Sequence, residues 1–242
     1  MRRMAIFAAL TAWATLAAVR APAPPDAPDA GTDRPRDPWV FRCVLDQQPR
    51  MVVIALHEHL WVAYDATDCT LYKAWDGDVK FTGAVYDYVH GPQPEVRGQT
   101  LIEGESGADW AVATADGQLI DATAPTWRGY RFESDSVVLQ FEITLPGGQV
   151  VAITESPEVS VDERGRIALS RTFAVGDLPD QRTIVLRLPT TAMLSGRAHY
   201  VLDGEELTPA RMPETARPFV ALRSGAARTL ITHFASEEGG RR

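Results

Sequence analysis

Aromatic, histidine and cysteine residues gather between Trp39 and Gly98, in a stretch that reads WVFRCVLDQQPRMVVIALHEHLWVAYDATDCTLYKAWDGDVKFTGAVYDYVHGPQPEVRG. It holds three of the chain's six tryptophans, four of its six tyrosines, three of its five histidines and both cysteines. Aromatic rings supply flat apolar area, and Tyr and Trp keep a polar atom at the rim. On a β-rich surface this mixture favours recognition of a carbohydrate or a cofactor.

The most specific element of the stretch is the loop His90-Gly91-Pro92-Gln93-Pro94. Two prolines fix φ and Gly91 permits an otherwise strained turn, so the loop is expected to be rigid. A rigid loop can present His90 and Gln93 to a ligand with little cost in ordering. The alternative is a structural corner in which the histidine caps a backbone carbonyl.

The aromatic residues of the same stretch are spaced so that some share one face of a strand: Tyr72, Trp75, Phe81, Tyr86 and Tyr88. They could form a platform that stacks on sugar rings, or they could pack in the core of a sandwich. Trp127 and Tyr130 raise the same alternatives. The candidate ligand-binding residues are therefore Tyr72, Trp75, Tyr86, Tyr88, His90 and Gln93.

Other polar groups in the stretch point to turns rather than to chemistry. His57 and His59 could flank a metal, but they straddle a predicted hairpin turn, where exposed polar residues are expected. Asp76-Gly77-Asp78 predicts another turn and supplies only a fragment of a calcium site. The chain has no nucleophile elbow, P-loop, dinucleotide fingerprint or HExxH motif. We therefore assign no catalytic residue, metal ligand or cofactor, and favour a protein that is not an enzyme.

Cys43 and Cys69 are the only cysteines. Two lone cysteines in an exported protein most often pair, and such a disulfide would contribute about 3 kcal/mol by closing a loop. The alternative is two separate buried thiols. Neither cysteine has a CxxC or CxxH partner, and no CxxCH haem motif is present.

The elements that must position these residues are strands. A meander of three short strands is predicted at 51–56, 60–64 and 70–75, and Pro146-Gly147-Gly148 predicts a hairpin between 137–145 and 149–155. Further strands are predicted at 109–114, 129–133, 167–175, 182–188, 199–202 and 229–234, with a loop over 205–218. Helical periodicity is absent after the N-terminal segment. The fold class is therefore all-β, an antiparallel β-sandwich or supersandwich with few or no helices.

The N-terminal residues follow the pattern of an export signal. Arg2 and Arg3 precede an apolar run of about sixteen residues, short for a membrane span, and Val19-Arg20-Ala21 offers a cleavage site. An uncleaved anchor is the alternative, and would be the only contact with a membrane. We predict a signal peptide over 1–21, a disordered Pro/Ala/Asp-rich linker over 22–37, a single β-sandwich domain over 38–235 and a flexible tail over 236–242. The predicted location is periplasmic or secreted.

The charge of the chain excludes some partners. Its formal net charge is −8, and removal of residues 1–21 would take away three arginines and no acidic residue. Lys and Arg form no extended cluster, so a nucleic acid or an anionic lipid surface is disfavoured.

Three segments resemble a known type of region: WVFRCVLDQQPRMVVIALHEHLWVAYD, LYKAWDGDVKFTGAVY and HGPQP. Together with ITESPEV and LSRTFAV, they resemble an uncharacterised β-rich region that accompanies c-type cytochrome and glucose/sorbosone dehydrogenase-like modules in large secreted bacterial proteins. The resemblance implies an accessory periplasmic domain that serves sugar oxidation or polysaccharide handling. This chain lacks a haem motif and the length for a six-bladed propeller, so redox activity is not implied.

Three hypotheses for function follow. The leading one is an exported, non-catalytic accessory module that binds a carbohydrate or a periplasmic partner protein through residues 57–98. The second is a sugar-active hydrolase or lyase of supersandwich type, with His90 and Asp87 or Glu95 as acid and base. The third is a structural subunit of a periplasmic redox complex.

Overall fold

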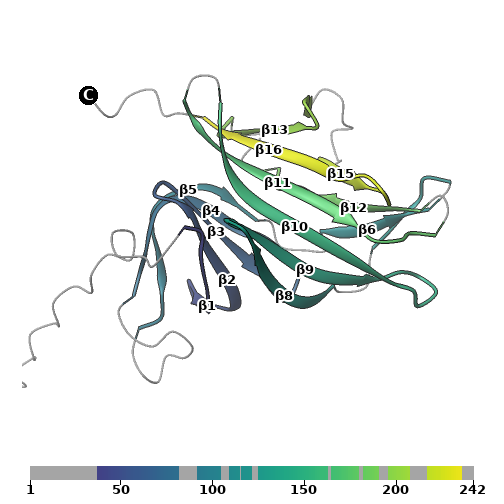
Figure 1. The fold of residues 1–242 in the computed structure, drawn as a ribbon, viewed down its shortest axis with the longest axis horizontal. Helices are drawn as coiled ribbons and strands as arrows, with labels where there is room; N and C mark the ends of the chain where they lie inside the picture. Colours follow the sequence, from purple (N-terminus) through teal and green to yellow (C-terminus); the bar gives the residue numbers. More distant parts are fainter. Residues whose placement is uncertain are drawn as a thin grey trace, which may run out of the picture.

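The computed structural model describes residues 37–81, 92–104, 109–114, 116–121, 125–162, 165–179, 182–190, 196–207 and 217–235. Every regular element in these ranges is a β-strand, and the strands form three antiparallel sheets (Figure 1). The predicted all-β, sandwich-like fold class is confirmed. Within the same ranges there is no helix long and apolar enough to cross a bilayer. The predicted signal peptide, nearly all of the predicted linker and the predicted tail lie outside the described residues.

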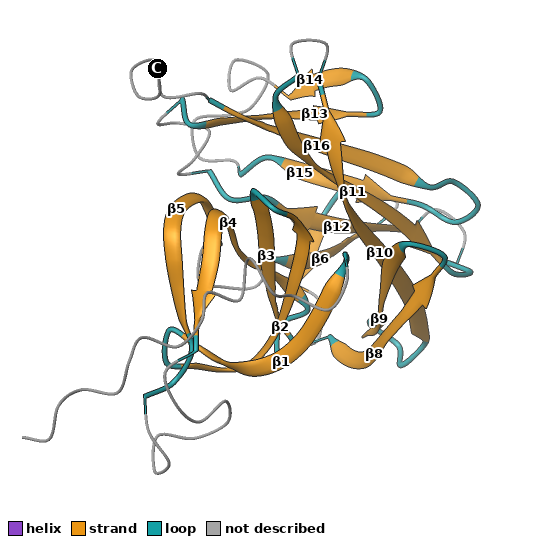
Figure 2. Ribbon diagram, turned by 60° about the vertical axis from the view of Figure 1, so that its left-hand side comes forward, coloured by secondary structure: helices purple, strands orange, loops and turns teal. Residues whose placement is uncertain are grey.

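The first sheet is a five-stranded meander, in the order β1 (Trp39–Leu45), β2 (Gln48–His57), β3 (Leu60–Asp65), β4 (Thr70–Lys80) and β5 (Glu95–Glu103). The meander predicted over residues 51–75 is present as β2, β3 and β4. The outer strands β1 and β5 were not predicted from the sequence. Figure 2 shows how this sheet curls beside the other two.

The turn predicted at Asp76-Gly77-Asp78 is wrong, because these residues lie inside β4. Gly77 pairs with Gly98 of β5, and the two have φ values of 144° and 122°. A Cβ on Gly77 would lie 2.1 Å from the Arg97 carbonyl oxygen, and one on Gly98 would lie 2.1 Å from the Asp76 carbonyl oxygen. The two glycines let the backbones approach so closely that the ladder continues where a turn was expected.

The second sheet has seven strands, in the order β14 (Glu205–Leu207), β13 (Ala198–Leu202), β16 (Arg228–Phe234), β11 (Ile167–Val175), β10 (Val150–Val161), β9 (Ser136–Thr144) and β8 (Thr126–Glu133). The predicted hairpin at Pro146-Gly147-Gly148 joins β9 to β10, with Gly147 and Gly148 at positive φ. The predicted loop over 205–218 begins with the short strand β14, and residues 208–216 lie outside the described part.

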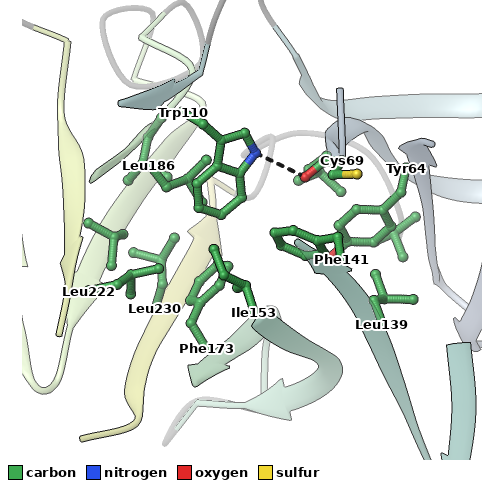
Figure 3. Close-up of a cluster of buried hydrophobic side chains, with 14 of the residues drawn as sticks. Tyr64, Cys69, Trp110, Leu139, Phe141, Ile153, Phe173, Leu186, Leu222 and Leu230 are labelled. Carbon is green, nitrogen blue, oxygen red and sulfur yellow. Dashed lines mark hydrogen bonds between the residues drawn. The ribbon is translucent and has the colours of Figure 1, made fainter. Parts of the chain in front are cut away.

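The third sheet has four short strands, in the order β15 (Phe219–Leu222), β12 (Thr183–Arg187), β6 (Trp110–Ala113) and β7 (Leu119–Asp121). All three sheets contribute to one main core, which includes Ile54, Tyr64, Cys69, Trp110, Leu139, Phe141, Phe173, Leu186, Leu222 and Leu230. Figure 3 shows Trp110 at its centre, where the indole Nε1 donates a hydrogen bond to the Cys69 carbonyl at 3.3 Å.

The opposite face of the five-stranded sheet carries a second core, formed by Cys43, Leu45, Met51, Val53, Ala55, Trp61, Ala63, Trp75 and Val79. Val52 and Ile54 of β2 face the main core, whereas Met51 and Val53 face the second core. Burial on both faces explains why β2 reads as a continuous apolar run instead of alternating with polar residues.

The β1–β2 turn is bound to the start of β5, which explains the curl of the sheet. The backbone N–H of Asp46 donates to the Pro94 carbonyl at 3.1 Å, and Asp46 Oδ1 accepts from the Val96 N–H at 2.9 Å. Val96 and Phe81 pack against the second core from the same end of the hairpin. The β1–β2 turn and the start of β5 are thus held together beside the face of the sheet that carries the second core.

The predicted disulfide between Cys43 and Cys69 is wrong, and both cysteines are free and buried. The reason is the side of the sheet that each one occupies: Cys43 belongs to the second core and Cys69 to the main core. The alternative of two separate buried thiols is the one observed. Burial raises the pKa of each thiol to about 12, which disfavours the reactive thiolate.

Candidate functional site

The structure describes three of the six predicted ligand-binding residues, Tyr72, Trp75 and Gln93. Tyr86, Tyr88 and His90 lie outside the described residues. Trp75 is fully buried in the second core, where it stacks on Trp61 with ring centroids 6.0 Å apart. Its Nε1 donates to the Asp78 carbonyl at 3.0 Å. A buried ring with its polar atom already bonded cannot stack on an external ligand.

Tyr72 is partly exposed on β4, where a register shift in the pairing with β3 leaves an extra residue. The ammonium of Lys73 lies 5.1 Å from the centre of the Tyr72 ring. Lys73 also forms ion pairs with Asp46 at 2.8 Å and with Glu103 at 3.5 Å. Tyr72 therefore presents an aromatic ring beside a small charged network that joins β4, β5 and the β1–β2 turn.

Burial of Lys73 opposes its charge, but the hydrogen bond and the negative charge of Asp46 outweigh this effect and raise the Lys73 pKa. Burial is the main reason why the pKa of Tyr72 is raised, so its hydroxyl keeps its proton. Gln93 is partly exposed and precedes Pro94, whose carbonyl also binds Asp46. Tyr72 is next to Lys73 in the chain, and Gln93 is next to Pro94. Lys73 and Pro94 both bind Asp46.

A second group of aromatic residues, which we call the β1 aromatic cluster, consists of Trp39, Phe41 and Phe81. Trp39 and Phe41 have ring centroids 4.9 Å apart, and Phe81 lies 6.3 Å from Trp39 and 5.2 Å from Phe41. All three side chains are partly exposed and pack against the second core. Trp39 and Phe41 lie on β1, which is an edge strand of the five-stranded sheet, and Phe81 directly follows β4.

Trp39 and Phe41 were not among the predicted site residues, although the sequence carried a signal for them. In WVFRCVL the residues at alternate positions are Trp39, Phe41, Cys43 and Leu45, which is the period of a half-buried strand. A strand assigned to this segment would have placed both rings on one face. The segment was instead treated only as the beginning of the folded part.

His57 ends β2 and is partly exposed, and His59 lies in the β2–β3 turn and is exposed, so the two residues flank the predicted hairpin turn. Their rings lie 6.1 Å apart, the His59 N–H donates to His57 Nδ1 at 3.2 Å, and His59 Nδ1 lies 3.2 Å from Asp76 Oδ1. Across the described part of the chain, no group of three or more His, Cys, Asp or Glu residues is arranged to hold a metal ion.

Most of the hypothetical acid and base groups lie outside the described residues. His90 and Asp87 lie outside them, and Glu95 is exposed at the start of β5. The structure therefore describes only one of the three groups on which a hydrolase or lyase mechanism would depend.

A buried polar triad links two of the sheets. Glu155 Oε1 accepts from the Tyr64 hydroxyl at 2.5 Å and from Arg171 Nε at 2.6 Å. The exposed fractions of these side chains are 1% for Tyr64, 0% for Glu155 and 3% for Arg171. Such a triad is closed to any substrate in this conformation, so it serves to join β3 to β10 and β11.

The pKa shifts in the triad follow from burial and charge. Burial is the main cause of the raised Tyr64 pKa, and the neighbouring negative charge of Glu155 adds to it. Burial opposes the charge of Arg171, but Glu155 and Tyr64 outweigh that effect and raise the Arg171 pKa. Tyr64 therefore stays neutral and Arg171 stays charged.

The sequence analysis missed this triad, but alternation could have found it. Val151, Ile153 and Glu155 share one phase of β10, and Leu169, Arg171 and Phe173 share one phase of β11. A charged residue at an inward position of each of two paired strands is the signal of a buried ion pair.

Comparisons with protein-family models, with curated proteins and with solved structures found no match for the chain. The resemblance to regions that accompany cytochrome and dehydrogenase-like modules therefore stays a prediction.

Proposed function

We propose that this chain is an exported, non-catalytic β-sandwich module that binds a partner protein through the β1 aromatic cluster. The observation that carries the proposal is the contact of three partly exposed rings: Trp39 and Phe41 on the edge strand β1, and Phe81 directly after β4. Aromatic residues dominate the energy of protein–protein interfaces when they are clustered and surrounded by a well-packed core. The second core supplies that support from below.

The geometry of the rings favours a protein over a polysaccharide. The planes of Trp39 and Phe41 meet at 38°, those of Trp39 and Phe81 at 46°, and those of Phe41 and Phe81 at 57°. Rings inclined at these angles offer no single flat platform on which a sugar chain could stack. Two of the three rings are phenyl groups, which offer no hydrogen bond to a hydroxyl.

The charged groups nearest to this sheet support binding rather than catalysis. Lys73 is held between Asp46 and Glu103 in ion pairs. A general acid or base is instead expected to have a pKa near the working pH. The Lys73 pKa is shifted upward, away from that range.

A second candidate function is carbohydrate binding at Tyr72. The observation that favours it is the partly exposed Tyr72 ring beside Lys73, with Asp46 and Glu103 within reach of the same ammonium. One aromatic ring bordered by charged and amide groups could hold a single sugar ring by stacking and hydrogen bonds. Gln93 adds an amide near Asp46.

The two candidates are separated by site-specific photo-crosslinking in cells that express and export the full chain. A photoreactive phenylalanine analogue is placed at position 41, at position 72 and, as a control, at the exposed position 97 of β5. We expect a discrete protein adduct from position 41 alone. In the purified complex, Phe41→Ser should weaken binding about 30-fold or more, because a central aromatic anchor contributes about 2 kcal/mol.

A glycan array completes the test. Binding to a defined glycan that Tyr72→Ala abolishes and Phe41→Ser leaves intact would establish the carbohydrate function and overturn the protein-binding proposal. Equal crosslinking from positions 41 and 97 would also contradict it, since the adducts would then reflect random collisions.

A further inference from the structure

Strand β1 presents a short, regular edge of the five-stranded sheet. Within the part of the chain that the structure describes, it pairs with β2 alone. Residues 39–43 pair with residues 51–55 without a shift, and the register changes only between Cys43 and Leu45. In an antiparallel pair, alternate residues direct both backbone groups away from the partner strand. Residues 39–43 therefore offer backbone N–H and C=O groups to a further strand.

The other edge of the same sheet, β5, is already bonded at its start. The Val96 N–H donates to Asp46 Oδ1, and the Pro94 carbonyl, just before the strand, accepts from the Asp46 N–H. On β1, by contrast, residues 39–43 have no backbone hydrogen bond to another described residue apart from their pairing with β2. Of the two edges, β1 is therefore the one that is open to pairing.

The two faces of β1 differ in chemistry. Trp39 and Phe41 lie on the second-core face. Val40 packs against the main core, and Arg42 shares that face, because it lies opposite Val52 of the main core. Unlike Val40, Arg42 is exposed. A strand added to β1 would therefore meet aromatic rings on one face and a guanidinium on the other.

Arg42 is the only charged residue of β1. Its neighbour across the pair is the buried Val52, and its guanidinium has no ion pair or hydrogen bond with another described residue. In the same sheet Lys73 is matched by Asp46 and Glu103. An unmatched cation on a chain with a formal net charge of −8 is complementary to a carboxylate from another molecule.

We propose that the partner protein supplies an extended segment that pairs with β1 as an additional strand and carries a carboxylate opposite Arg42. This inference rests on the proposed function, because it names the part of the partner that the β1 aromatic cluster contacts. Since side chains alternate along a strand, the residues before and after the acidic one lie on the second-core face. The recognised sequence is therefore apolar–acidic–apolar.

The backbone and the side chains of this segment contribute differently. Hydrogen bonds between the two backbones supply affinity, and side chains at alternate positions supply specificity. Apolar side chains beside Trp39 and Phe41 extend the second-core layer, and cross-strand pairs of this kind stabilise a sheet, as do pairs of opposite charge. Because both rings already pack against the second core, binding costs little further ordering.

Fluorescence anisotropy with the purified full chain tests the charge pairing. The probes are two labelled peptides of alternating threonine and valine, with glutamate in one and lysine in the other replacing the central threonine, and with Gly-Ser ends for solubility. Wild type should bind the glutamate peptide about tenfold more tightly, because the lysine peptide places like charges across the pair. Arg42→Glu should reverse this preference.

Arg223→Glu is the matched control. Arg223 is exposed just after β15 and, like Arg42, has no ion pair with another described residue, so its reversal should leave the preference unchanged. Phe41→Ser should weaken the binding of both peptides without changing the ratio of their affinities. Urea unfolding of each variant verifies that it is folded.

The backbone pairing is tested with N-methylated glutamate peptides. Methylation of alternate amides removes the hydrogen-bond donors along one edge of the peptide only. Methylation in one phase should abolish binding to wild type, whereas methylation in the other phase should leave binding intact, because a strand pairs through alternate residues.

Equal binding of the glutamate and lysine peptides by wild type would mean that Arg42 only blocks unwanted pairing, and would overturn the inference. So would the failure of both peptides to bind at millimolar concentration, or equal losses from the two phases of methylation. Any of these results together with a discrete protein adduct from position 41 would leave the proposed function standing. Absence of both the adduct and peptide binding would overturn the two proposals together.

Discussion

The five-stranded and the seven-stranded sheets bury their residues in different ways. Both faces of the five-stranded sheet are covered, one by the main core and the other by the second core. The seven-stranded sheet buries only its inner face. Its outer face carries short polar side chains that are partly exposed, including Ser156, Ser170, Thr172 and Thr229.

This difference determines where the molecule can recognise something. On the seven-stranded sheet, polar alternation keeps the outer face soluble, and large apolar groups are exposed only at single positions of β8 and at the two ends of β10, within the described residues. On the five-stranded sheet both faces are apolar and need to be buried. Trp39, Phe41 and Phe81 stay partly exposed because the second core buries only part of each ring. The proposed binding surface is therefore a place where the second core reaches the edge strand β1.

The largest expected effect concerns the triad that joins these two sheets. Arg171→Met should destabilise the protein by about 3–5 kcal/mol, because it leaves the Glu155 carboxylate buried without its cation. The double variant Glu155→Leu, Arg171→Met should recover most of this loss, since an apolar pair of similar size needs no compensation. Urea unfolding of the wild type and the two variants measures both free energies.

The single and double variants must be compared under identical conditions. The Tyr64 hydroxyl loses its acceptor in the double variant alone, so this cost is part of the difference between the two variants. If Arg171→Met changed the free energy of unfolding by less than about 1 kcal/mol, the carboxylate would not be buried and charged as described. The link between the two sheets would then rest on apolar contacts alone.

A smaller effect tests the contrast between the faces directly. Val53 of β2 points away from the main core but is fully buried in the second core, whereas Ser170 of β11 points away from the main core and is partly exposed. Val53→Ser should destabilise by about 2 kcal/mol through lost burial. Ser170→Val should change stability by no more than about 0.5 kcal/mol.

Thermal or urea unfolding of the two variants side by side gives the answer. Equal, small effects would mean that the second core is open to solvent, and the support beneath the β1 aromatic cluster would be lost. A large loss at Ser170 would mean that the outer face of the seven-stranded sheet is covered in solution.

Much of the fold could be predicted because most strands read clearly in the sequence. The hairpin at Pro146-Gly147-Gly148 and the meander from Met51 to Trp75 have turn residues between apolar runs, and both are present. The turn predicted at Asp76-Gly77-Asp78 failed because glycine has two uses, and local composition cannot tell a turn from a close backbone approach. Gly77 and Gly98 are far apart in the sequence, so neither segment alone predicts that they pair.

The candidate site was harder to predict, because burial decides the role of an aromatic residue. Trp75 and Tyr72 lie three residues apart on one strand, yet Trp75 is fully buried and Tyr72 is partly exposed. The disulfide failed for a similar reason: spacing along the chain does not show which face of a sheet each cysteine occupies. In both cases the missing information was which face of the sheet each residue occupies, and how completely that face is covered.

The smallest expected effect is a pH dependence on the outer face of the seven-stranded sheet, where His199 of β13 stacks on His233 of β16 with ring centroids 4.7 Å apart. Partial burial lowers the pKa of His199 below its ordinary value; His233 and Arg166 lower it further, while Glu206 of β14 raises it. The unfolded chain therefore binds this proton more readily than the folded one. The contribution of His199 to stability should be fully present above about pH 6.5 and should fall as the pH drops toward the pKa of the folded state.

Urea unfolding between pH 8 and 5 measures how the free energy of unfolding depends on pH, and His199→Gln should make this dependence weaker. A stability that rises on acidification through this window, and does so only with His199 present, would reverse the assigned direction and show that Glu206 outweighs burial, His233 and Arg166.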